Sequence, residues 1–92
     1  MEYIKGENRY YVVDGDKEIA EITYSTDGEN ILIIDHTAVD SNYRGQKIAE
    51  TLVKLVVDQA IVEGKEIVPL CPYAAKVFSR KVEYQKIQKK EM

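Results

Sequence analysis

The first part of the chain has the short apolar runs and alternations of β-strands separated by turns. Residues 10–13 are aromatic and β-branched, and the turn Asp14-Gly15-Asp16 follows them. Side chains alternate in polarity along residues 19–24, as expected for a strand with two different faces. Residues 31–34 are apolar on both faces, which predicts a central strand covered on both sides and continuing to Val39.

From residue 48 onward, the spacing of apolar residues changes from the two-residue period of a strand to the roughly 3.6-residue period of a helix. Between residues 48 and 61 the apolar positions are Ile48, Ala49, Leu52, Val53, Leu55, Val56, Val57, Ala60 and Ile61. Polar residues occupy the opposite stripe, where Glu50 and Lys54 are spaced for an i,i+4 ion pair. Gly64 suits the end of this helix, because a helix C-terminus favours a residue with positive φ.

A second strand and a second helix follow. Residues 66–70 predict a short strand that returns parallel to the earlier central strand through a right-handed crossover. Pro72 suits the first turn of a helix whose apolar face begins at Tyr73. Residues 85–92 lack a period and are expected to fray. The order of elements predicts one α+β (mixed α/β) domain over residues 1–92.

Length, charge and cysteine content narrow the class of protein. Ninety-two residues form one domain, and a formal net charge of −3 argues against nucleic acid as a partner. A single cysteine, no signal-like N-terminus and no apolar run of membrane-spanning length indicate a cytoplasmic protein. One Cys and one His, far apart in the chain, do not predict a metal site.

The junction between the central strand and the long helix is the most informative segment. A helix N-terminus presents unpaired N–H groups and the positive end of a dipole, which suit a phosphate. Gly45 leaves room for a ligand, and Arg44 and Lys47 add positive charge. The alternative is an ordinary strand–helix turn capped by Asp40 or Ser41. Neither the three-glycine dinucleotide signature nor a P-loop is present in the sequence.

The segment Arg44-Gly45-Gln46-Lys47-Ile48-Ala49 resembles the Arg/Gln-x-x-Gly-x-Gly/Ala turn of GCN5-related N-acetyltransferases. In that family the backbone amides of the turn hold the pyrophosphate of CoA. Lys47 stands where the family usually has glycine. The resemblance therefore implies acetyl-CoA as cofactor and residues 44–49 as part of its site.

The resemblance extends to a small subgroup of this superfamily with chains about as long as this one. It rests on His36-Thr37-x-Val39, Arg44-Gly45, Ile48-Ala49, Cys71-Pro72-Tyr73 and Glu83-Tyr84, in this order. It implies a minimal acetyltransferase fold, a mixed sheet splayed at its centre with CoA in the gap. Thr37 and Val39 would then lie on the strand whose backbone meets the pantetheine and the thioester.

Three side chains are candidates for catalysis, each with an alternative. Cys71 is predicted at a helix N-terminus, where the dipole favours a thiolate, although free cysteines are commonly buried and inert. The resemblance places this cysteine near the acetyl group. His36 could accept a proton from an amine or be an ordinary strand residue. Tyr73 could donate a proton to the departing thiolate or simply pack on the helix face.

The second predicted helix adds two cations. Lys76 and Arg80 could extend towards the phosphates of CoA, or they could form an exposed cationic face. Together these residues predict an N-acetyltransferase that moves an acetyl group from acetyl-CoA to an unidentified amine on a protein, peptide or small molecule. The amine would attack directly, with His36 or water as base, or Cys71 would first take the acetyl group. The alternatives are a non-catalytic CoA-binding or protein-interaction module and a Cys71/His36 thiol hydrolase.

Overall fold

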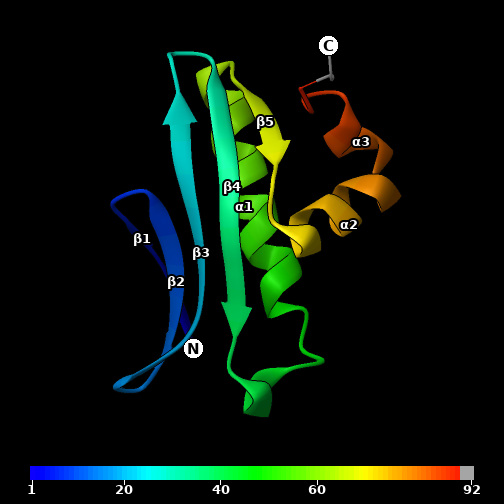
Figure 1. Ribbon diagram of the computed structural model, residues 1–92. Coiled ribbons are helices and arrows are strands. Elements are labelled where there is room, and N and C mark those ends of the chain that lie inside the picture. The colour runs from blue at the N-terminus through cyan, green and yellow to red at the C-terminus, as the bar shows by residue number, and fades with distance from the viewer. Residues whose placement is uncertain (90–92) are drawn as a thin grey trace.

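Five strands form one mixed sheet in the computed structural model, which describes residues 1–89 (Figure 1). The strand order is β1-β2-β3-β4-β5, in which neighbours pair antiparallel except for the parallel pair β4–β5. This arrangement confirms the predicted α+β class and the parallel return. The elements are β1 (Glu2–Gly6), β2 (Arg9–Asp14), β3 (Lys17–Asp27), β4 (Ile31–Val39), the 3-10 turn η1 (Ser41–Tyr43), α1 (Ile48–Glu63), β5 (Glu66–Pro69), α2 (Pro72–Arg80) and α3 (Val82–Gln85).

The sheet splays between β4 and β5, as expected from the resemblance. The two strands pair only from Ile31 opposite Glu66 to Ile34 opposite Pro69. The chain then leaves the sheet, and the last contact is a hydrogen bond from the Cys71 N–H to the Ile34 carbonyl at 3.0 Å. Beyond this point β4 continues to Val39 without a strand beside it on that edge in the described part of the chain.

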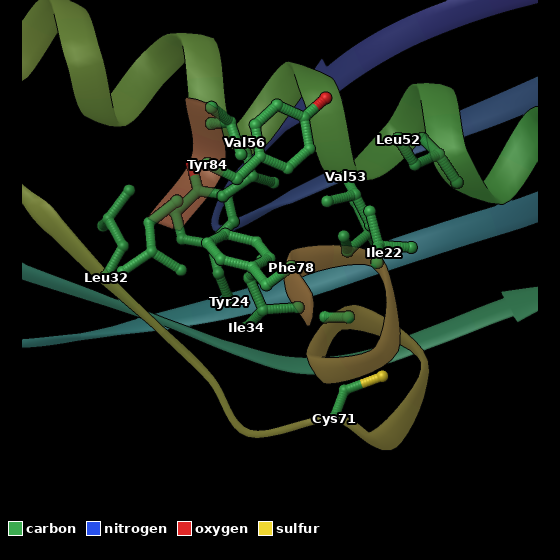
Figure 2. Packing of buried hydrophobic residues seen from close by; sticks show 14 of the residues in the cluster. Ile22, Tyr24, Leu32, Ile34, Leu52, Val53, Val56, Cys71, Phe78 and Tyr84 are labelled. Atoms are coloured by element: carbon green, nitrogen blue, oxygen red, sulfur yellow. The ribbon is translucent and has the colours of Figure 1, made fainter. Parts of the chain in front are cut away.

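The hydrophobic core lies between the sheet and the helices. Leu32 and Ile34 of β4 have no exposed surface and pack with residues of α1 and with Phe78 of α2 (Figure 2). Ile31 and Ile33, on the other face of the strand, are only partly buried. The prediction that this strand is covered on both faces is therefore wrong, because its second face has no comparable layer of buried side chains.

The predicted helix α1 ends as expected but carries a different ion pair. Gly64 adopts φ 70°, and its N–H donates to the carbonyls of the last turn. Lys54 pairs with Asp58 at 2.9 Å rather than with Glu50. Glu50 is partly buried, and its negative charge acts on the phenol of Tyr73.

The C-terminal segment is held along β5 as far as the structure describes it. The Ile67 N–H donates to the Ile87 carbonyl at 2.8 Å, and the Lys89 N–H donates to the Ile67 carbonyl at 2.9 Å. Of the segment 85–92 that was expected to fray, residues 85–89 are thus connected to the fold, and residues 90–92 lie outside the described residues. Between residues 1 and 89, no helix is long and apolar enough to cross a membrane.

Candidate functional site

A cavity of about 590 Å³ opens where the end of β4 meets the start of α1. Most of the residues predicted to bind the cofactor contribute to its walls, and so does Tyr73 from α2. Gln46 is the one residue of the predicted turn that does not. The lining residues are Thr37, Ala38, Val39, Tyr43, Arg44, Gly45, Lys47, Ile48, Ala49 and Tyr73.

A β-bulge decides which side chains of β4 face this cavity. Thr23 of β3 is opposite His36 and Tyr24 is opposite Ile34, so Asp35 is the extra residue. An extra residue reverses the alternation of a strand. Thr37 and Val39 therefore point to the same face as Ile34 and are partly buried, whereas His36 is exposed on the opposite face.

The N-terminus of α1 is open towards the cavity. The first helical hydrogen bond runs from the Thr51 N–H to the Lys47 carbonyl at 3.0 Å, so the amides of residues 48–50 precede the hydrogen-bonded ladder. No side chain caps this helix. Asp40, predicted as an alternative cap, accepts instead from the N–H of Asn42 in η1 at 2.8 Å. The uncapped amides and the helix dipole make this end of α1 suited to an anion.

The turn before α1 has a left-handed backbone at two positions. Gly45 adopts φ 86° and Lys47 adopts φ 62°. Such a conformation disfavours a residue with a Cβ by about 1–2 kcal/mol, which is why glycine is common there. Lys47 thus retains the glycine-like backbone at the position where the motif usually has glycine. It is the residue before α1 and not part of the helix, and its side chain and that of Arg44 are exposed beside the cavity.

Tyr73 forms the wall of the cavity on the side of α2. It follows Pro72, which occupies the first position of that helix as predicted. Partial burial, followed by the negative charge of Glu50, raises the pKa of Tyr73 above its ordinary value of 10.0, although Arg80 opposes the shift. The phenol is therefore protonated at neutral pH and can donate its proton.

Cys71 lies at the N-terminus of α2, as predicted, but it is only 5% exposed and does not line the cavity. Figure 2 shows its sulfur at the start of α2, near the core. Its thiol donates to the Oγ1 of Thr37 at 3.5 Å. The thiol is thus paired with Thr37 rather than with His36, so the arrangement that a thiol hydrolase requires is not formed.

The structure places two predicted cations outside the cavity and brings one unpredicted residue, Tyr43, into its lining. Lys76 and Arg80 are exposed on α2 and lie outside the lining of the cavity. Tyr43 was not predicted, although its partly buried ring lines the cavity. Its hydroxyl donates to Asp14, 29 residues away in sequence, and no local pattern indicates such a contact. Within residues 1–89, no group of three or more His, Cys, Asp or Glu side chains could hold a metal ion.

Comparisons with known proteins agree with this geometry. A family model described as GCN5-related N-acetyl-transferase matches residues 9–87. The solution structure of a GCN5-like candidate N-acetyltransferase from Staphylococcus aureus superimposes with a TM-score of 0.81 at 32% identity, covering 99% of this chain and 90% of that one.

A more distant likeness concerns the fold alone. The crystal structure of Rv2747 from Mycobacterium tuberculosis, in complex with CoA and NLQ, has a TM-score of 0.62 at 15% identity. The match covers 79% of this chain and 46% of Rv2747. The comparison with curated proteins gave no match. From the family match and the shared fold with the Staphylococcus aureus protein, the chain belongs to the GCN5-related N-acetyltransferase family.

Proposed function

We propose that the chain transfers an acetyl group from acetyl-CoA, the acyl donor of its family, to an amine. The observation that carries the proposal is the cavity of about 590 Å³ at the splay of the sheet. It combines an edge of β4 that is unpaired past Ile34 within residues 1–89, an uncapped helix N-terminus and a partly buried tyrosine. These three features suit, in turn, the amide groups, the phosphates and the departing thiolate of a nucleotide thioester.

The pyrophosphate of CoA would bind at the start of α1. The amides of residues 48–50 have no acceptor within the helix, and the dipole of this helix favours negative charge. Arg44 and Lys47 add two cations at the rim of the cavity. Lys76 and Arg80, exposed on α2, are proposed to attract the remaining phosphate charge. The complex of Rv2747 with CoA supports this proposal, because part of that CoA-bound protein shares the fold of this chain.

The pantetheine arm would extend along the free edge of β4. Past Ile34 this edge has no neighbouring strand within residues 1–89, and Thr37 and Val39 line the cavity there. The backbone N–H and C=O groups on a free strand edge can pair with an extended ligand, as they would with another strand. The amide groups of pantetheine are suitable partners.

The reaction then requires two proton transfers. The amine nitrogen attacks the thioester carbonyl carbon, a C–N bond forms, the C–S bond breaks and CoA leaves as a thiolate. Tyr73 is proposed to give its proton to this thiolate, because it lines the cavity and remains protonated at neutral pH. The proton of the amine is proposed to pass to water or, across the free edge of the strand, to His36, which is exposed on the face of β4 opposite to the cavity.

Burial of Cys71 favours direct attack over a covalent acetyl-cysteine. A nucleophile must reach the thioester carbon, but this thiol is 5% exposed, donates to Thr37 and is not part of the lining of the cavity. After incubation with acetyl-CoA and no amine, we therefore expect intact-protein mass spectrometry to show an unmodified chain. A mass increase of one acetyl group that the Cys71→Ser variant lacks would establish the covalent route instead.

Thermal unfolding with added ligands tests the proposed cofactor. Acetyl-CoA and CoA are expected to raise the apparent stability by about 2.7 kcal/mol at a concentration one hundred times the dissociation constant. ATP and NAD, which lack the pantetheine arm, are expected to give a smaller shift. A shift with ATP or NAD and none with CoA would contradict the proposal.

A second function is a module that binds CoA without transferring its acetyl group. One observation favours it, since the lining of the cavity contains no carboxylate or imidazole that could act as a base. Release of free CoA from acetyl-CoA in the presence of a panel of primary amines separates the two functions. Stabilisation by CoA without release for any amine would support the module.

A further inference from the structure

The loop between β4 and α1 is anchored at Asp40 to the β2–β3 hairpin. The Asp40 N–H donates to the Ile19 carbonyl at 2.7 Å, and the Asp40 carboxylate lies 3.1 Å from the Nζ of Lys17. The same carboxylate accepts from the Asn42 N–H. The hydrogen bond from Asn42, and then that from Lys17, hold the pKa of Asp40 below its ordinary value. This carboxylate is therefore ionised, and it joins the loop to the first residue of β3.

A second anchor acts through Tyr43, directly before the cofactor turn. Its hydroxyl donates to the Oδ2 of Asp14 at 2.5 Å, and Asp14 is the last residue of β2. Its ring packs against the hydrophobic core and lines the cavity. Asp14 pairs with Lys17 across the hairpin, so both anchors come from a single turn, residues 14–17. Neither Asp14 nor Lys17 lines the cavity.

The second half of the loop has no anchor of this kind. Among the described residues, the side chains of Arg44 and Lys47 form no ion pair, and no side-chain hydrogen bond reaches residues 44–46. Within residues 1–89, the side-chain hydrogen bond made to this turn comes from the hydroxyl of Thr51, which donates to the Lys47 carbonyl at 2.9 Å. The position of the turn is therefore set by α1 on one side and by Tyr43 on the other.

We propose that the hairpin turn 14–17 positions the cofactor-binding turn 44–47, with Asp14 and Lys17 as positioning residues that do not touch the cofactor. The inference rests on the proposed function, because it concerns the same CoA site. Ion pairs and hydrogen bonds at an exposed surface contribute little to global stability. Their effect here is on the position of the turn 44–47, with Arg44 and Lys47, beside the amides of residues 48–50, and hence on the affinity for CoA.

Substitutions at Asp14 and Tyr43 test this role. Asp14→Ala is expected to weaken CoA binding about fivefold in titration calorimetry, because one hydrogen bond to a charged acceptor is lost. Asp14→Asn retains an oxygen acceptor and is expected to restore part of the affinity. Tyr43→Phe is expected to weaken CoA binding to a similar extent. The double variant is expected to bind CoA no more weakly than Asp14→Ala alone, because both substitutions remove the same hydrogen bond. Asp16→Ala, in the same turn but without a side-chain contact to the loop, is the matched control.

The outcomes separate this inference from the proposed function. If the unmodified protein binds CoA and Asp14→Ala binds it as tightly as Asp16→Ala does, the positioning role is wrong and the proposed function stands. If the unmodified protein does not bind CoA, the proposed function fails. Amide hydrogen exchange of residues 44–50 in the ligand-free protein then decides the positioning role. Faster exchange in Asp14→Ala than in Asp16→Ala supports it, and equal rates overturn it.

Discussion

Tyr73→Phe is expected to lower the rate of acetyl transfer about 10²-fold to 10⁴-fold, the usual contribution of a general acid. The phenol lines the cavity on the side of α2 and is the proposed proton donor to the CoA thiolate. Phenylalanine keeps the ring that forms the wall, so the affinity for CoA is expected to change little. The rate of acetyl transfer is measured as release of free CoA with the most reactive amine of a panel. The affinity for CoA is measured separately by titration calorimetry.

The pH dependence of the rate distinguishes a proton donor from a packing residue. Burial and the charge of Glu50 raise the pKa of Tyr73 above 10.0. The proton-donating form is therefore present at neutral pH and is lost only as the pH rises through this raised pKa. The unmodified protein is expected to lose its proposed acetyl-transfer activity in this alkaline range, and the pH profile of Tyr73→Phe is expected to lack that loss. Tyr84→Phe is the matched control, because the pKa of Tyr84 is also raised by burial although it lies outside the cavity. Equal rates for the two variants would refute the role of Tyr73.

Lys47→Gly is expected to stabilise the fold and to weaken CoA binding. Glycine adopts the φ of 62° found here without the penalty that a Cβ imposes, but it also makes the unfolded chain more flexible. The expected net gain is about 0.5–1 kcal/mol, or about 3–6 °C in Tm for a domain of this size. Loss of one cation beside the phosphate site is expected to weaken CoA binding about tenfold. Thermal unfolding and titration calorimetry measure the two effects.

Two further variants separate backbone strain from charge. Asn8 also has a positive φ, 58°, in the turn between β1 and β2, and it does not line the cavity. Asn8→Gly is expected to raise Tm by less than Lys47→Gly does, because asparagine tolerates a positive φ better than lysine. It is expected to leave CoA binding unchanged. Lys47→Gln keeps the strained backbone and is expected to weaken binding without raising Tm. If Lys47→Gln bound CoA as tightly as the unmodified protein, the charge of Lys47 would have no part in the site.

Local sequence determined the elements and the place of the site. The helical period, the glycine at its end and the proline at the start of α2 are signals within a few residues of the structure they specify. The Arg44–Ala49 motif joined a strand to this helix, and most of its residues do line the cavity. The family resemblance added the splay of the sheet, which the register of β4 and β5 confirms. The helices and the turn could be predicted because each depends on neighbours in the chain, whereas the splay joins segments more than thirty residues apart and was expected from the resemblance alone.

Only the tertiary structure decided how the side chains of the site are arranged. The bulge at Asp35 arises from pairing with β3, and it places Thr37 at the cavity and His36 on the opposite face. The burial of Cys71 depends on the packing of α2 against the sheet, and the role of Tyr43 depends on a carboxylate 29 residues earlier. A shift of one residue in strand register moves every side chain beyond it to the other face of the sheet. A contact between residues far apart in the chain produces no periodic pattern in the sequence. The sequence therefore predicted a candidate site at the junction of strand and helix, where the cavity lies, and the packing of distant segments determined which side chains face that cavity.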